Sequence, residues 1–300
     1  MKNFLVLTII LMLGACGRVA AQDAAAASKR ANQQYVLFES ERDKGTNVTG
    51  MYSYLLDSYE NFMKVVEAPD NGQYLSGAKN RLRAMYPYLL NGAVYYSEQK
   101  QPSKALDFAA AYIEMPRLKI FQSELLPKDN RYASVVYYAA VSAYNLQKYS
   151  QALKYFQEYL STGTDTQQKD CYVYMNMIYQ SQKKYADQER ILLKANEKYP
   201  VSLDFLYNLV NVYIATNDME KLLGAIDRIL AVDPNNDKVL PIKARILERQ
   251  GKNIEALDIY KRLYALYPNN FELMTGVARA NFNCATEIVN NGATIANDTE

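Results

Sequence analysis

The second half of the sequence repeats with a period of 34 residues, and this period restricts the fold more than any other feature. Three prolines mark the period: Pro200, Pro234 and Pro268. Large side chains keep the same interval at Tyr172, Leu206, Leu240 and Met274. A period of this length is typical of repeat arrays, in which each unit buries its apolar face against the next one. We therefore predict a linear array of units in place of a single globular core.

Each repeat has the pattern of two helices joined by a tight turn. In one repeat, apolar residues recur at intervals of three and four, which places them on one helical face: Leu206, Leu209, Val210 and Tyr213. In the next repeat, the turn Gln250-Gly251-Lys252 precedes a second helical segment with an apolar face, Glu255 to Tyr260. The pattern predicts a helix hairpin in each repeat and therefore an all-α fold.

The residues at fixed positions of the repeat resemble those of the tetratricopeptide repeat family. The matching positions are Tyr207-Asn208-Leu209, Gly251, Ala256, Tyr260 and Pro268. The segment from Asn145 to Phe156 matches the turn and second helix of the family pattern. The resemblance implies an all-α, right-handed superhelical solenoid of antiparallel helix hairpins. It also implies a protein that holds a partner segment in a concave groove.

The predicted organisation has four parts. Residues 85–270 form the tetratricopeptide array, with an insertion at 116–130, and residues 22–84 form divergent N-terminal hairpins that cap it. The interval from Tyr149 to Tyr185 is 36, and we place the two extra residues in the loop at 161–165. Residues 271–300 begin a further, incomplete repeat, because Asn290-Asn291-Gly292 stands where a second amphipathic helix should start.

The first residues predict export. Lys2 precedes an apolar run from Phe4 to Leu13, which is typical of a secretory signal and too short to span a bilayer, since a spanning helix needs about 20 residues. Two kinds of processing remain open. Residues 1–21 form an ordinary signal peptide if cleavage follows Val19-Ala20-Ala21, or residues 1–15 are removed and Cys16 is lipidated, as in a bacterial lipoprotein. Both place the protein in the periplasm or on the periplasmic face of the outer membrane.

The composition argues against catalysis. The chain has no histidine, which removes imidazole bases, Ser-His and Cys-His nucleophile pairs and histidine metal ligands. The cysteines lack metal-ligand spacing, and we expect Cys171 and Cys284 to be free thiols. The net charge of +2 gives no broad footprint for nucleic acid. We therefore predict no enzyme activity, no cofactor, no metal and no nucleic-acid partner.

The candidate binding residues are those that the repeat register places on the groove side of each first helix. They are Tyr137, Tyr144, Tyr207, Asn211, Arg245, Arg249 and Arg279. The groove is aromatic and polar at first and becomes basic toward the C-terminus, where guanidinium groups can bind the carboxylates of an acidic segment. Glu248, three residues after Arg245, is interpreted as a solvated helix charge.

These observations predict a non-catalytic scaffold or assembly factor of the bacterial cell envelope, which engages an envelope protein or peptide segment. Contact with a membrane is expected only through the lipid on Cys16. Two alternatives remain. The 27 tyrosines are compatible with a glycan-capture outer-membrane lipoprotein, and the interrupted last repeat is compatible with the tetratricopeptide arm of a longer multi-domain protein.

Overall fold

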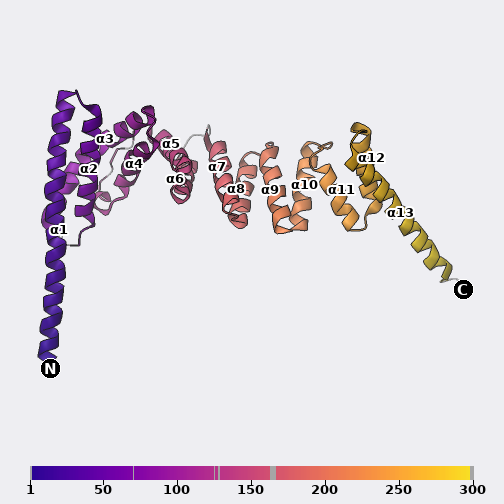
Figure 1. The fold of residues 1–300 in the computed structure, drawn as a ribbon, viewed down its shortest axis with the longest axis horizontal. Helices are drawn as coiled ribbons and strands as arrows, with labels where there is room; N and C mark the ends of the chain where they lie inside the picture. Colours follow the sequence, from indigo (N-terminus) through magenta and orange to yellow (C-terminus); the bar gives the residue numbers. More distant parts are fainter. Residues whose placement is uncertain (1, 70, 125, 128, 163–166, 298–300) are drawn as a thin grey trace. The chain divides into compact units, whose positions relative to one another are not determined.

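The computed structural model describes the backbone of residues 2–69, 71–124, 126–127, 129–162 and 167–297, with the side chains in these ranges except 2–22 and 291–297. Every regular element within these ranges is a helix (Figure 1). The chain forms two compact units, Met1–Cys171 and Tyr172–Glu300, and each is described by itself. The predicted all-α array of antiparallel hairpins is confirmed.

The first unit holds three hairpins and a short insertion. Its helices are α1 (Lys2–Lys44), α2 (Val48–Glu67), α3 (Gly72–Glu98), α4 (Pro102–Glu114), α5 (Tyr132–Asn145) and α6 (Tyr149–Thr162). The helix α7 (Gln168–Ser181) begins in this unit and continues into the second. The core between the helices is apolar, with Leu55, Leu82 and Phe108 fully buried. Burial of each such side chain stabilises the fold by about 1.5–3 kcal/mol.

The second unit continues the same alternation of first and second helices. After α7 its helices are α8 (Tyr185–Lys198), α9 (Leu203–Thr216), α10 (Met219–Val232), α11 (Leu240–Arg249), α12 (Asn253–Leu266) and α13 (Phe271–Asn297). The last three helices share one core, in which Ala244 of α11 and Ala280 of α13 are fully buried beside Leu263 of α12. The two alanines are small enough to let neighbouring helices approach closely.

A left-handed residue recurs at the turn of five hairpins and explains the sharp reversals of the chain. These residues have φ between 53° and 74°: Lys100, Gln147, Lys183, Asn217 and Gly251. In each turn the N–H of the next residue donates to the carbonyl five residues earlier, as Asp218 does to Tyr213 (3.0 Å) and Lys252 to Leu247 (2.9 Å). Only one of the five is a glycine, which strains least in this region.

The predicted insertion is present between α4 and α5. It contains two 3-10 turns, η1 (Met115–Arg117) and η2 (Lys119–Phe121), and Phe121 is buried. Farther along, Glu124 forms ion pairs with Lys79 (2.8 Å) and with Arg83, both on α3. The insertion is therefore tied to the surface of the first unit.

Several expected boundaries differ from the helices observed. A border between residues 84 and 85 falls inside α3, because the apolar periodicity runs through it. The helix α13 continues past Asn290 to Asn297, since asparagine and glycine weaken a helix but do not remove a backbone donor as proline does. The five residues between α6 and α7 include 163–166, so the expected two-residue extension at 161–165 lies largely outside the described residues.

The N-terminal predictions fall mostly outside the described side chains. The side chain of Cys16 lies there, although the backbone at this position belongs to α1. Among the described residues, no helix is long and apolar enough to cross a membrane. The expectation for the other two cysteines is confirmed, because Cys171 and Cys284 are both free thiols. Burial raises the pKa of the Cys171 thiol to about 12, so it stays protonated at neutral pH.

Candidate protein-binding site

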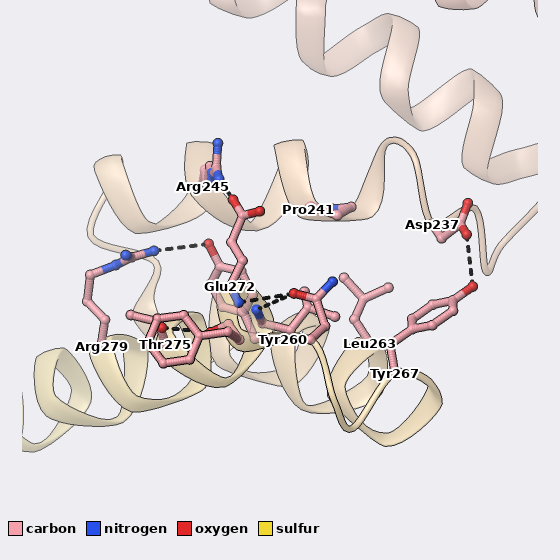
Figure 2. Close-up of a pocket in the computed structure, with 12 residues that line it drawn as sticks. Asp237, Pro241, Arg245, Tyr260, Leu263, Tyr267, Glu272, Thr275 and Arg279 are labelled. Atoms are coloured by element: carbon pink, nitrogen blue, oxygen red, sulfur yellow. Dashed lines mark hydrogen bonds and ion pairs between the residues drawn. The ribbon is translucent and has the colours of Figure 1, made fainter.

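A pocket of about 450 Å³ lies between α11, α12 and α13 in the second unit (Figure 2). We call it the C-terminal pocket. Its lining includes the predicted site residues Arg245 and Arg279, and also Asp237, Pro241, Tyr260, Leu263, Tyr267, Asn270, Phe271, Glu272, Leu273 and Thr275. Two first helices and the second helix between them therefore contribute to one site.

Arg245 does not stand free at this pocket. Its guanidinium pairs with the carboxylate of Glu272 from α13, and both side chains are well exposed, at 57% and 71% (Figure 2). Exposed pairs of this kind contribute about 0–1 kcal/mol to stability, because water and salt screen them. The pair neutralises Arg245 in this structure. Because the pair is weak, a carboxylate of another molecule can compete with Glu272 for Arg245.

Arg279 is held much more firmly. Its Nε and Nη2 atoms donate to the two carboxylate oxygens of Glu248, each at 2.9 Å. The Tyr260 hydroxyl donates to Glu248 Oε2 at 3.0 Å, and the Glu248 side chain is only 10% exposed. The hydrogen bonds to Glu248 raise the pKa of Arg279. The interpretation of Glu248 as a solvated charge was wrong, because α13 covers it and supplies its partner.

Local features fix the position of α13 at the pocket. The Asn270 side chain caps the helix by accepting from the N–H groups of Glu272 (3.0 Å) and Leu273 (3.2 Å). A Cβ atom on Gly276 would lie 2.7 Å from the Tyr260 ring, so glycine is what lets α13 approach α12 here. At the opposite end, the Tyr267 hydroxyl donates to Asp237 Oδ2 at 2.8 Å (Figure 2).

The remaining predicted residues of the second unit do not join the C-terminal pocket. Tyr207 is half-buried, because its hydroxyl accepts from Asn236 Nδ2 (2.6 Å) and Lys238 lies 5.1 Å from its ring centroid. Asn211 is exposed on α9, and Arg249 is exposed at the end of α11. Tyr207 thus helps to order the loop before α11, whereas Asn211 and Arg249 stay accessible.

A second pocket, of about 320 Å³, lies between α3, α4 and α5 in the first unit. We call it the Tyr138 pocket. Its lining is mostly apolar or small: Ala93, Val94, Ser97, Glu98, Ala105, Ala109, Val135, Tyr138, Ala139 and Ser142. Tyr138 is 64% exposed and Val94 is 37% exposed, so large apolar groups face solvent here. Such a hollow suits an apolar side chain of a partner.

The repeat register predicted Tyr137, the residue next to Tyr138, as a binding residue. Tyr137 is half-buried, packs on Tyr159 with ring centroids 5.3 Å apart, and its hydroxyl lies 3.4 Å from Asp170 Oδ2. Tyr144 is also half-buried and lies beside Tyr149, at 6.0 Å between centroids. One residue turns a helix by about 100°, so an error of one position exchanges an exposed side chain for a packed one. Helical spacing could have identified the residues that face the Tyr138 pocket. They include two pairs four positions apart, Val94 with Glu98 on α3 and Tyr138 with Ser142 on α5.

Metal-ligating side chains do not cluster in the described part of the chain. No group of three or more Cys, Asp and Glu side chains there could hold a metal ion. The carboxylates at the C-terminal pocket are each engaged by Arg245, Arg279 or a tyrosine hydroxyl.

No family model matches the sequence. A curated relative, the uncharacterized protein y4yS of Sinorhizobium fredii, is 29% identical over 83 residues, which cover 28% of this chain and 46% of that protein. The match thus spans about half the length of the relative.

Several solved structures match the chain at low identity and with TM-scores below 0.5. MamA residues 41-end from Desulfovibrio magneticus RS-1 match at 15% identity and a TM-score of 0.38, over 63% of this chain and 97% of that one. PilF of Pseudomonas aeruginosa matches at 12% and 0.37, over 85% and 99%. A tetratricopeptide repeat protein from Parabacteroides merdae matches at 14% and 0.32, over 84% and 99%.

Matches this weak give no information about function. The fold assignment therefore rests on the sequence and structure of this chain. The 34-residue period, the five left-handed turns and the antiparallel hairpins all agree. The chain is therefore an all-α array of antiparallel helix hairpins, with a 34-residue period that resembles that of tetratricopeptide repeats.

Proposed function

We propose that the protein is a non-catalytic binding module that holds a segment of a partner protein, with an apolar side chain of the partner in the Tyr138 pocket. The observation that carries this proposal is the exposure of Tyr138 in an otherwise apolar hollow. An amphipathic tyrosine ring with few rotatable bonds gives contact area at low entropic cost, which is why tyrosine is enriched at interface hot spots.

The second part of the proposal is a separate site in the second unit, which binds an acidic residue of a partner. Its carboxylate replaces Glu272 at Arg245, because the exposed Arg245–Glu272 pair stabilises the free protein little. Arg249 lies one turn farther along α11 and is exposed, so it supplies a second cation. Arg279 has no such role in the proposal, since its bidentate bonds to Glu248 are worth more than a rim contact.

The proposed place of action is the bacterial cell envelope. The support is the signal-like run from Phe4 to Leu13 and the small residues before Cys16. Metabolic labelling with a palmitate analogue tests the lipidated form, because label lost in a Cys16→Ser variant assigns the anchor. Label absent from both proteins, with a mature N-terminus at Gln22, assigns ordinary cleavage instead.

The direct test of the binding function uses a matched pair of variants. Val94→Glu places a charge in the Tyr138 pocket, whereas Val48→Glu places the same charge on α2 outside it. The two valines are similarly exposed, at 37% and 41%. We expect a partner recovered by crosslinking from the envelope to bind Val94→Glu at least about tenfold more weakly, while Val48→Glu binds as the wild type.

Two outcomes would contradict the proposal. Equal recovery of the partner with both variants would move the site away from the Tyr138 pocket. Turnover or modification of a bound molecule by the purified protein would contradict the non-catalytic assignment. Circular dichroism of both variants checks that the fold is unchanged.

A further inference from the structure

One face of α13 is apolar, uncharged and exposed along its described length. Its residues follow helical spacing: Phe271, Met274, Ala278, Phe282, Ala285 and Val289. The two phenylalanines are 75% and 71% exposed, and Val289 is 68% exposed. The opposite face carries Leu273 and Ala280, which are buried in the core of the second unit. We call the exposed face the α13 stripe.

The repeat register shows that such positions are normally covered. Met274 and Ala278 correspond, 34 residues earlier, to Leu240 and Ala244, which are 4% and 0% exposed in the hairpin of α11 and α12. One repeat before that, Leu206 and Val210 are 2% and 3% exposed. In contrast, Met274 is 44% exposed. The stripe therefore has the surface of a first helix, and within the described residues no second helix packs on it.

The order of side chains along the stripe is symmetric about Phe282. Reading from Met274 to Val289, the side chains alternate large, small, large, small, large, with Ala278 and Ala285 on either side of Phe282. A surface that is complementary to its own copy is what a twofold interface needs. In an antiparallel pair, the two Phe282 rings meet beside the twofold axis, and the small side chains of Ala278 and Ala285 on either side leave room for them. We propose that α13 pairs in this way with α13 of a second copy of the chain.

The charges around the stripe permit this pairing. None of its six residues is charged, so no like charges face each other across the twofold axis. The nearest cation, Arg279, is neutralised by Glu248, and Glu287 accepts from Asn253 Nδ2 at 3.3 Å. Pairing of the two helices therefore does not bury an ionised group that lacks a hydrogen-bond partner.

The available area fits a weak dimer. An aromatic side chain buries about 150–250 Å², so the two phenylalanines supply roughly 250–350 Å² per copy at their observed exposure. Met274 and Val289 supply roughly 200 Å² more per copy at their observed exposure, which gives about 900–1,100 Å² over both copies. This area lies near the lower limit of about 1,000 Å² for a specific interface, so we expect a weak dimer. This dimer does not depend on the function proposed above.

Sedimentation of the full chain tests the proposal directly. We expect the wild type to shift from monomer to dimer between about 1 and 200 μM, and Phe282→Glu to stay monomeric over that range. Ile254→Glu is the matched control, because Ile254 is 76% exposed on α12 and lies outside the stripe. It should dimerise as the wild type does. A wild type that stays monomeric, or dimers that tolerate Phe282→Glu, would overturn the proposal.

The register of the pair has its own test in a Cys284→Ser background. Antiparallel pairing places residue 278 of one copy opposite residue 285 of the other, whereas the two copies of residue 278 lie about 10 Å apart along the axis. Mixing Ala278→Cys with Ala285→Cys under mild oxidation should therefore give a disulfide-linked heterodimer. Efficient linkage of either variant to itself would show a parallel or different arrangement and overturn this geometry.

Discussion

The two pockets differ in the side chains that they expose to solvent. The C-terminal pocket is rich in charge, but Glu272 and Glu248 of the same unit already neutralise its two arginines. The Tyr138 pocket has few charges, and its large apolar side chains face solvent. When a partner binds a cation that is already paired within the protein, one carboxylate only replaces another, so the gain in binding free energy is small. Burial of exposed apolar area breaks no existing pair, so it contributes its full free energy to binding. The contrast predicts that binding energy concentrates at the Tyr138 pocket.

The largest expected effect concerns the packing beneath the Tyr138 pocket. A Cβ atom on Gly92 of α3 would lie 2.5 Å from the Phe108 ring of α4, and Phe108 is fully buried. We expect Gly92→Ala to destabilise the protein by about 2 kcal/mol, as overpacked cores do. Gly77→Ala in the same helix is the control, since nothing lies within 4 Å, and it should stabilise by about 0.5 kcal/mol. Urea unfolding followed by circular dichroism measures both, and equal values would mean that the Phe108 ring can move aside.

The next effect separates the two arginines of the C-terminal pocket. Arg279→Ala leaves the nearly covered Glu248 carboxylate with only the Tyr260 hydroxyl, so we expect a loss of about 1 kcal/mol. Arg245→Ala should change stability very little, because Glu272 is well exposed. Thermal unfolding of the two variants gives the comparison. Equal losses would show that the Arg245–Glu272 pair is stronger than its exposure suggests.

A smaller effect is expected from salt. When partner binding is measured at about 0.05 M and 0.5 M NaCl, the loss caused by Arg245→Glu should shrink severalfold at the higher concentration, because salt screens exposed charges. The loss caused by Val94→Glu should stay nearly the same, since it comes from blocking an apolar pocket. A Val94→Glu effect that disappears in salt would remove the distinction between the two pockets.

The smallest effect is a pH dependence at the edge of the C-terminal pocket. The hydrogen bond to Asp237 raises the pKa of Tyr267 above its usual value of about 10. Because the folded-state pKa is the higher one, this bond contributes stability below pH 10 and loses it as pH rises through the folded pKa. Between pH 8 and pH 11, the melting temperature of the wild type should fall slightly more than that of Tyr267→Phe. An identical fall would show that the bond contributes nothing to stability.

Sequence reasoning predicted the architecture well because helix hairpins depend on local spacing. The interval of 34 residues and the three-and-four spacing at Leu206 and Leu209 were enough to place a hairpin in each repeat. The left-handed turns at Lys100, Gln147 and Lys183 could not be recognised by residue type, because none of them is glycine or asparagine. The match to the repeat pattern from Asn145 to Phe156 placed the turn at Gln147, whereas the turns at Lys100 and Lys183 were found only in the structure.

The candidate site was less accessible to sequence reasoning because it depends on neighbours far along the chain. Tyr137 and Tyr138 differ by one position, and only the packing of Tyr137 on Tyr159 decides which ring faces solvent. Likewise, the guanidinium of Arg279 meets the carboxylate of Glu248 from 31 residues away.

The sequence by itself determined that this protein is a helical repeat array with a signal-like start and without histidine chemistry. These properties follow from local periodicity and residue type, which need no knowledge of long-range contacts. The tertiary structure alone decided which cations are neutralised, which tyrosine is exposed and which face of α13 lacks a partner. Each of these depends on the side chains that an adjacent helix brings within a few ångströms, and packing of neighbouring hairpins sets that contact.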